Sequence, residues 1–322
     1  MLNPPVAEIT PGLWRITLPL PFDLRQVHVH LLRLPGDGWM LIDSGLNNEE
    51  NRAALRAGLA VAGIRLDEIR TILLTHTHPD HVGNATWLKR ETGAELMLHE
   101  EEQAHLARIE RDPDSLIDTL LEAAGAPAAQ AAPTREAFLA LRKSFRVQPA
   151  ERLLRGGEIL ETALGAAETI LTPGHSPGHL CLHLGDRRIL IAGDHVLPII
   201  TPIIWWSPAG DNLAAYLEAL GVIDRCDGSL ALPSHGERIE ALAQRTGEIR
   251  AHHRARCAAI LGALDVERTA HELVPFLWRR ALSAFNYRFA LDEVLAHLEY
   301  LGRLGQVERR AVNGALRWRA AE

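Results

Sequence analysis

The chain is poor in cysteine and in aromatic residues. Only three of its 322 residues are cysteines, and aromatic residues make up 5% of the total. Cys181, Cys226 and Cys257 are odd in number, lie far apart and form no C-x-x-C pair. This pattern argues against a disulfide framework and a cysteine-based zinc site, and it fits a reducing compartment, so we expect a cytoplasmic protein.

The sequence also lacks a basic excess and any long uninterrupted apolar run. Its net charge is −7, which argues against general coating of nucleic acid. The most apolar stretch, residues 189–206, is interrupted by Gly193, Asp194, His195 and two prolines, so we expect no membrane span. The first twelve residues show no basic segment followed by an apolar core, and we expect no signal peptide.

What is present is an ordinary globular composition, with 47% hydrophobic and 23% charged residues. A chain of this length buries enough apolar surface to fold without disulfides. The length fits one large domain with a small one, or two domains of middle size.

The first third of the chain alternates short apolar runs with turns and helical patterns. Residues 27–34 and 38–43 flank a Pro-Gly-Asp turn and predict a hairpin. Residues 47–63 predict a helix, residues 71–75 a short buried strand, and residues 80–92 the next helix. This alternation of strands and helices predicts an α/β sandwich.

Residues 101–147 are rich in Ala and Glu and predict a helical insertion, with breaks around Gly125 and Pro133. Six apolar residues recur there at roughly helical spacing: Leu106, Ile117, Leu120, Leu121, Phe138 and Phe145. We expect them to form an internal packing face, with one wall of a substrate cleft as the alternative. Between residues 168 and 234 four short apolar runs again predict strands.

A third region follows at about residue 245. Residues 248–264 and 290–305 predict helices, and Thr269 predicts the cap of a short helix between them. Asn313-Gly314 separates two extended runs and predicts a two-residue hairpin. Three helices followed by a hairpin are typical of a winged helix.

The strongest chemical signal is the segment THTHPDH, which supplies His76, His78, Asp80 and His81 within six residues. At the end of a buried strand, such alternation turns imidazoles toward one point, while Asp80 and His81 reach a neighbouring point. Neutral imidazoles and carboxylates are the ligands expected for zinc, with iron or manganese as rivals. A solvated loop that is rich in histidine by chance is the alternative.

Four further ionisable residues share one context, the end of an apolar run beside a glycine. They are Asp43, His175, Asp194 and His235. Each alone would more often be a turn or capping residue. Together with His76 they place five ionisable groups at strand ends, where layered α/β proteins build their sites.

The order of these motifs resembles that of the metallo-β-lactamase superfamily of binuclear metallohydrolases, over about residues 8–240. The resemblance implies a four-layer αββα sandwich that occupies residues 1–245 and contains the helical insertion. Residues 246–322 are similar to the winged-helix domain that follows this fold in some hydrolase and nuclease branches. Asp194 stands where the main zinc β-lactamases carry a cysteine, so antibiotic hydrolysis is not favoured.

The resemblance also implies a role for each motif residue. The ligands implied for one metal are His76, His78 and His175. Those implied for the second are Asp80, His81 and His235. Asp194 would bridge the two metals, and Asp43 would orient ligands. The implied cofactors are two divalent ions, with zinc preferred to iron or manganese.

The implied reaction is hydrolysis by a hydroxide shared between the two metals, which needs no side-chain nucleophile. Asp80 is the candidate that passes a proton to the leaving group. Trp205 and Trp206 follow Asp194 in a proline-rich segment, and they predict either core packing or an apolar wall beside the substrate.

Two functions remain open. The first is hydrolysis of an ester, lactone or thioester of a small molecule, which the two tryptophans, the insertion and the acidic total charge favour. The second is an endoribonuclease or other phosphodiesterase that holds nucleic acid with its winged helix. Residues 250–322 contain 12 arginines against eight acidic residues, a small basic bias. Many such domains only pack or dimerise, so the partner of this domain could also be a second copy of the chain.

The other histidines are expected to bind no metal. Those expected at the surface are His28, His30, His252 and His253. Those expected in the core or behind the ligands are His179, His183 and His195.

Overall fold

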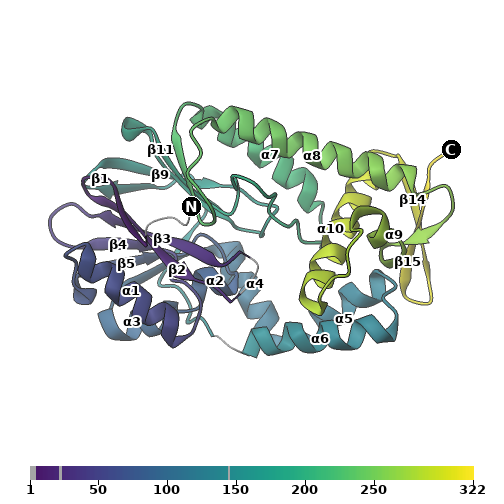
Figure 1. Cartoon of the computed structure of the whole chain (residues 1–322), viewed down its shortest axis with the longest axis horizontal. Coiled ribbons are helices and arrows are strands. Elements are labelled where there is room, and N and C mark those ends of the chain that lie inside the picture. Colours follow the sequence, from purple (N-terminus) through teal and green to yellow (C-terminus); the bar gives the residue numbers. More distant parts are fainter. Residues whose placement is uncertain (1–4, 22–23, 144–145) are drawn as a thin grey trace.

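Two β-sheets lie face to face in the part of the molecule that the computed structural model describes, residues 5–21, 24–143 and 146–322 (Figure 1). Within these residues the first sheet has seven strands in sequence order: β1 Val6–Thr10, β2 Leu13–Pro19, β3 Gln26–Arg33, β4 Trp39–Ile42, β5 Ile69–Leu73, β6 Glu95–His99 and β7 Arg152–Leu154. The second has five, in the order β12-β11-β10-β9-β8: Leu230–Pro233, Ile189–Gly193, Leu180–Leu184, Gly165–Leu171 and Ile159–Thr162.

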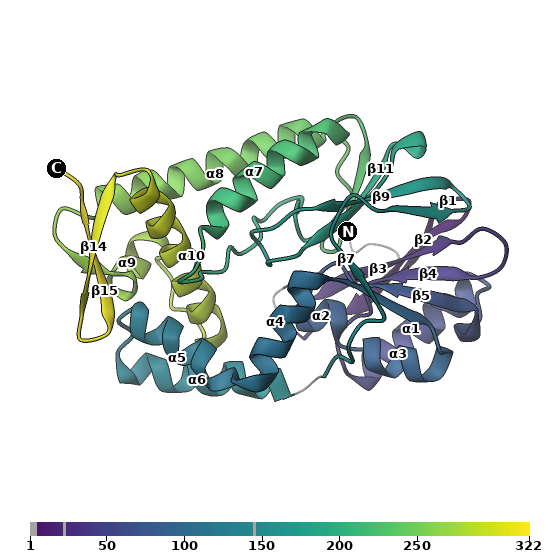
Figure 2. The same cartoon turned by 180° about the vertical axis from the view of Figure 1, so that it is seen from behind.

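Apolar cores separate four layers. Between the sheets, side chains such as Leu73 and Ile191 are 1% exposed. The helices outside the sheets are α1 Glu49–Val61, α3 Ala85–Thr92, α7 Asn212–Ile223 and α8 Leu242–Gly262. The first two pack on the outer face of the first sheet, and the last two pack on the second sheet (Figure 2). The expected αββα sandwich is confirmed.

The direction of the strands brings the predicted site residues to one edge. β4, β5 and β6 run parallel, as do β11 and β12, so each set places its carboxyl ends together. Asp43 directly follows β4, and His76 follows β5 by three residues. Asp194 directly follows β11, and His235 lies two residues beyond β12.

The insertion consists of three helices: α4 Glu100–Arg111, α5 Pro113–Ala123 and α6 Ala128–Lys143. α5 begins at Asp112, whose side chain accepts a hydrogen bond from Ser115 N, and it ends before Gly125, where φ is +66°. The break expected at Pro133 is wrong. α6 continues through this residue, because the continuous helix buries Phe138 in the core shared with the C-terminal elements, which outweighs the local cost of the proline.

The C-terminal elements follow α8 in the order β13 Arg268–Thr269, α9 Ala270–Leu277, α10 Ala284–Arg303, β14 Val307–Val312 and β15 Ala315–Ala320. Thr269 caps α9 as expected, with its side chain accepting a hydrogen bond from Glu272 N. Asn313 and Gly314 have φ of +49° and +85° and close the β14–β15 hairpin. The winged-helix assignment and the boundary at residue 245 stay predictions.

Helices α5 and α6 of the insertion pack on each other and on the C-terminal elements. Ile117 and Phe138 of the insertion share a core with Leu291 of α10 and Trp318 of β15. Leu106 belongs to the core of the first sheet, and Phe145 lies outside the described residues. α8 extends from the second sheet to this shared core (Figure 1). The insertion and the C-terminal elements therefore form one packed unit.

None of the helices in the described ranges combines the length and the apolar composition that crossing a membrane requires. α8 has 21 residues, but it carries charged side chains such as Arg245 and Arg250 along its length.

Candidate metal centre

Two groups of potential metal ligands meet at the carboxyl edge of the sheets. Within each group the ligand atoms lie within 4.8 Å of one another. The first group is His76, His78, His175 and Asp194, and the second is Asp80, His81 and His235. Asp194 Oδ2 lies 3.7 Å from His175 Nε2 in the first group and 3.4 Å from His235 Nε2 in the second. One carboxylate thus faces both groups, and all seven predicted ligands are brought together.

Hydrogen bonds fix the rings of three of these histidines. His81 Nδ1 donates to Asp43 Oδ2 at 2.8 Å, and His175 and His235 donate from Nδ1 to backbone carbonyl oxygens at 2.8 Å. Because Nδ1 then carries a proton, Nε2 is the atom whose lone pair a metal would take. These three Nε2 atoms are buried and have no hydrogen-bond partner among the described residues. Orphaned, correctly oriented imidazoles fit a metal ion.

Asp43 is held in an unusual backbone conformation beside the second group. Its φ is +63°, a region that non-glycine residues rarely adopt. Thr75 donates to Asp43 Oδ1 from its backbone N at 2.8 Å and from its hydroxyl at 3.0 Å. The remaining oxygen, Oδ2, accepts from His81. Asp43 is thus placed to orient a ligand and does not itself enter either group.

Burial and neighbouring charges set the protonation of the second group. Burial lowers the pKa of His235, but Asp194 and Asp80 outweigh it and raise that pKa to about 10. Burial raises the pKa of Asp80, but His81 and His235 outweigh it and lower that pKa to about 2. The carboxylates are therefore ionised and hold protons on their histidine neighbours. A divalent cation would replace these protons, which is the ordinary way in which metal binding competes with protonation.

In the first ligand group the histidine pKa values are lowered instead of raised. Burial, followed by the neighbouring histidines His81 and His78, places the pKa of His76 well below its ordinary value. Burial also lowers the pKa of His175. These imidazoles are neutral and ready to donate lone pairs to a metal.

Comparison with known proteins identifies the family. Residues 22–235 match the family described as the metallo-beta-lactamase superfamily. The chain belongs to the metallo-β-lactamase superfamily. Residues 257–321 match a second family, the metallo-beta-lactamase-like C-terminal domain. The family and the two ligand groups together show a metal-dependent hydrolase.

Relatives cover nearly the whole chain. The probable metallo-hydrolase YqjP of Bacillus subtilis is 26% identical over 308 residues, which are 89% of this chain and 91% of that protein. The atrochrysone carboxyl ACP thioesterase of Aspergillus fumigatus is 24% identical over 293 residues, 87% of this chain and 77% of that protein. A crystal structure of a metallo-beta-lactamase family protein from Thermus thermophilus is 32% identical, with a TM-score of 0.85, and covers 97% of this chain and 100% of its own. A beta-lactamase domain protein from Burkholderia ambifaria is 30% identical, with a TM-score of 0.88 and coverage of 98% and 94%.

In this metallo-β-lactamase fold, Glu102 joins the two loops that carry the first ligand group. It is fully buried in the first turn of α4. Its carboxylate accepts from Thr77 N at 3.0 Å and Thr77 Oγ1 at 2.5 Å, and from Gly178 N at 2.7 Å. Nothing in the sequence singled out Glu102, because it ends a run of three glutamates that looks like ordinary helix N-terminal charge.

The two tryptophans occupy different environments. The Trp205 ring stacks on His78 with centroids 5.1 Å apart and an interplanar angle of 26°. Trp206 lies in the core shared by the insertion and the C-terminal elements, and its Nε1 donates to Glu299 at 3.3 Å. Trp205 alone of the pair borders the metal centre, while Trp206 serves packing.

Residues 203–206 connect the metal centre to α10. At one end the Ile203 carbonyl accepts the hydrogen bond from His175 Nδ1. Further along, Ile204 N donates to Glu293 Oε2 at 3.1 Å and Trp206 N donates to Asp292 Oδ1 at 3.2 Å. Both carboxylates belong to α10. The segment 203–206 thus links His175 of the first ligand group to α10 through hydrogen bonds at both of its ends.

The expectation that four histidines lie at the surface is wrong for three of them. His28 and His30 are 0% and 2% exposed, because β3 lies inside the first sheet and the loop of His235 covers its end. His253 is 1% exposed, because α8 packs between the second sheet and α10, where its ring meets His297. His252 is partly buried.

Of the three histidines expected in the core or behind the ligands, two are buried, while His183 is partly exposed and its Nε2 lies 3.2 Å from Ser229 Oγ. His179 is buried, and its Nε2 accepts a hydrogen bond from Asp194 N at 3.0 Å. His195 is buried with its ring against Tyr216.

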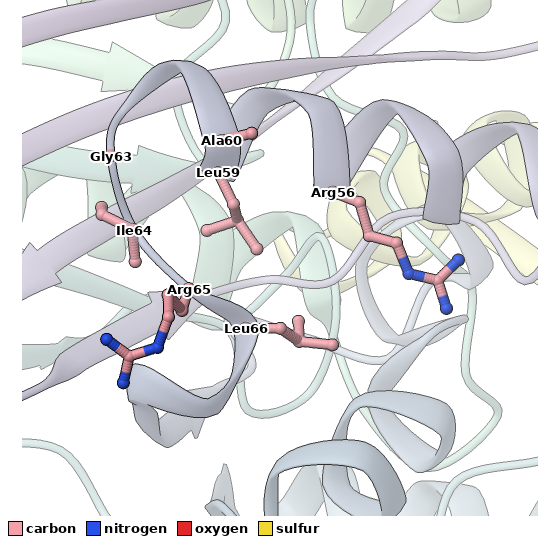
Figure 3. Close-up of a pocket in the computed structure, with 7 residues that line it drawn as sticks. All are labelled: Arg56, Leu59, Ala60, Gly63, Ile64, Arg65 and Leu66. Atoms are coloured by element: carbon pink, nitrogen blue, oxygen red, sulfur yellow. The ribbon is translucent and has the colours of Figure 1, made fainter.

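An open pocket lies elsewhere, where α1 turns into the following loop (Figure 3). Its lining consists of Arg56, Leu59, Ala60, Gly63, Ile64, Arg65 and Leu66. It contains neither ligand group, and we assign it no part in the chemistry.

Proposed function

We propose that the protein uses two divalent metal ions to hydrolyse an ester, lactone or thioester of a small molecule. The observation that carries this proposal is Asp194, whose Oδ2 faces histidines of both ligand groups. We assign one metal to His76, His78 and His175, and the second to Asp80, His81 and His235. Asp194 contributes to both. Zinc suits this set of imidazoles and carboxylates best, and iron or manganese are the alternatives.

The chain's own residues orient the reaction. Bound in the two groups, the metal ions would supply an activated water and polarise the oxygen of the scissile bond. Asp43 keeps His81 in the tautomer that offers Nε2 to the site. The Asp80 side chain is 16% exposed and lies 3.4 Å from His235, so it reaches the solvent side of the site. We place it there to pass a proton to the leaving group.

Two observations favour an acyl substrate. The relative from Aspergillus fumigatus is named as a thioesterase that acts on a carrier-protein substrate, and its similarity covers 87% of this chain. Trp205 provides an apolar surface directly beside His78. A thioester or ester with an apolar acyl portion fits both observations.

Four arginines of the C-terminal region form ion pairs with carboxylates of the same region. Arg309 pairs with Glu299, and Arg319 pairs with Glu308 at 2.6 Å. Arg310 and Arg317 both pair with Glu267 at 2.6 and 3.0 Å. These arginines are engaged with protein carboxylates, which weakens the case for a phosphodiester substrate.

The proposal is tested by turnover of the metal-loaded protein on an aryl ester, an acyl lactone, a thioester and a labelled single-stranded RNA. We expect acyl cleavage that falls to the uncatalysed background in Asp194→Ala, together with a loss of bound metal. Asp37→Ala, which removes an exposed carboxylate from the β3–β4 turn, is the matched control and is expected to keep full activity. Cleavage of RNA without acyl turnover would overturn the proposal.

We also propose a cytosolic location, supported by three free cysteines, of which Cys181 and Cys226 are buried. Fractionation of cells with an antibody to the protein tests this. Recovery with secreted protein would contradict it.

A further inference from the structure

A buried arginine lies on the far side of Trp205 from the chemistry proposed above. The Arg288 guanidinium carbon on α10 is 4.1 Å from the centroid of the Trp205 ring and 4.6 Å from that of Phe138. Its side chain is only 7% exposed. Because Trp205 also stacks on His78, a single aromatic side chain contacts both this arginine and a ligand group of the metal centre.

Each of these two side chains, Arg288 and Trp205, has a hydrogen-bond donor without an acceptor among the residues that the structure describes. Arg288 Nε and Trp205 Nε1 are both buried and unpartnered. Asp292 Oδ2 lies 3.5 Å from Arg288 Nη2 but forms no hydrogen bond, and Asp292 Oδ1 accepts from the backbone N of Trp206. Buried donors that stay unpaired are costly, so an acceptor from outside the chain, either water or a ligand atom, is expected here.

Positive charge accumulates around the same position. Burial, followed by the charge of Arg288, lowers the pKa of Arg142 on α6 to about 10. Burial, followed by neighbouring arginines that include Arg142 and Arg288, lowers the pKa of His105 on α4 to about 3. The His105 ring meets Trp205 edge-on at 6.1 Å. Facing charges of the opposite sign come from Asp292 and from Glu110. Arg142 and Arg288 are two cations that repel each other and are suited to an anion, whereas His105 is neutral.

We propose that Arg288 and Trp205 Nε1 bind an anionic oxygen group of the substrate, a carboxylate or a phosphate, while the metal centre cleaves the acyl bond of the same molecule. This inference rests on the proposed function. A guanidinium offers paired donors that match the oxygens of either group. A neutral substrate leaves both donors unpaired, so the site discriminates against it. Trp205 then lies between the bound anion and the metal centre.

Matched substrates test this preference. Glutaryl and pentanoyl thioesters of one neutral thiol differ in a terminal carboxylate on the acyl chain. Pentanoyl thioesters of pantetheine and of phosphorylated pantetheine place the charge on the leaving thiol instead. We expect the holoenzyme to prefer the charged member of one pair, which identifies where the anion is carried. Arg288→Gln is expected to reduce that preference in kcat/KM roughly ten- to hundredfold, mainly through KM.

Arg268→Gln is the matched control. Arg268 also covers an aromatic ring, with its guanidinium carbon 4.9 Å from the centroid of the Phe276 ring, and its Nε donates to the Ala263 carbonyl oxygen at 2.6 Å. It is expected to leave the preference unchanged. Arg288→Lys keeps the charge but loses the paired donors, so it should lie between wild type and Arg288→Gln. This second variant keeps the test decisive if Arg288→Gln fails to fold, as judged by circular dichroism.

Binding to the metal-free protein provides a readout without turnover. Calorimetric titration with glutarate and with inorganic phosphate should show binding that weakens about tenfold in Arg288→Gln and falls with added salt. Acyl cleavage without a charge preference, combined with no binding that depends on Arg288, would overturn the inference and leave the proposed function standing. Binding that depends on Arg288 without any acyl cleavage would instead support the anion site and refute the proposed function.

Discussion

Glu102 belongs to neither ligand group, yet three of its hydrogen bonds hold the loops of the first ligand group together. Glu102→Gln keeps the size of the side chain but replaces a charged acceptor by an amide with only one acceptor oxygen. We expect metal affinity and activity to fall about ten- to a hundredfold, the range typical of groups that orient ligands. Metal content after dialysis against a weak chelator measures this.

Glu101→Gln is the control for this prediction, because Glu101 is exposed in the same helical turn. It should retain metal as the wild type does. Equal retention in Glu102→Gln would show that the two loops hold their positions without this carboxylate.

At the residue scale, sequence predicts ligands better than it predicts what supports them. His76, His78 and Asp80 could be found because close spacing after a strand limits where their side chains point. Glu102 and Arg288 could not, since their roles depend on helices that pack across long stretches of sequence. His253 was misjudged for the same reason, because burial by α10 leaves no local signal in α8.

At the element scale, Gly174 allows the loop of His175 to approach α7. Its φ is +122°, and an added Cβ would lie 2.4 Å from Tyr216 Cβ and 2.7 Å from the Asn212 carbonyl oxygen. Gly174→Ala must therefore displace the helix or the ligand loop. We expect a loss of about 1–3 kcal/mol in the free energy of unfolding together with weaker metal retention, measured by urea denaturation and metal analysis.

Gly221 in the same helix offers the opposite case. An added Cβ there meets no atom within 4 Å. Gly221→Ala is expected to stabilise the protein by about 0.5–1 kcal/mol, because alanine favours the helix. Destabilisation by both substitutions to the same extent would contradict the steric argument for Gly174.

Local rules explain which elements could be predicted. The Thr269 cap and the Asn313-Gly314 hairpin depend on a few adjacent residues, and both are found where expected. The break predicted at Pro133 is absent, because a continuous helix buries Phe138 against the C-terminal elements. Packing between distant segments overrode a local signal there.

At the scale of the whole molecule, the insertion and the C-terminal elements share one core, and α8 joins that core to the second sheet. We expect the metal-free chain to unfold in one transition, so that urea curves followed by circular dichroism and by tryptophan fluorescence coincide. Two separate transitions would show that the C-terminal unit is stable independently of the sandwich.

Buried neutral histidines make the fold sensitive to acid. Burial lowers the pKa of His297 to about 3, whereas the unfolded chain has an ordinary value of 6.5. Below pH 6.5 the unfolded state therefore gains a proton that the folded state refuses, and the free energy of unfolding falls as pH drops toward 3. The free energy of unfolding of chelator-treated protein is expected to fall between pH 7 and pH 5. His297→Gln should make that fall smaller by about 2 kcal/mol. Urea titrations of both proteins at the two pH values measure the free energy of unfolding. The same fall in the variant as in the wild type would contradict the prediction.

The segment from Ile203 to Trp206 has a consequence for how this protein can change by recombination. Two backbone N–H groups of that segment depend on Asp292 and Glu293, while its Ile203 carbonyl fixes the ring of His175. A graft that replaces residues 246–322 with a domain lacking these two carboxylates would leave both N–H donors unpaired. The carbonyl of Ile203 would then no longer be held in place to orient the ring of His175. We therefore expect a chimaera with another C-terminal domain to keep the metal affinity of this protein only when the graft supplies both acids.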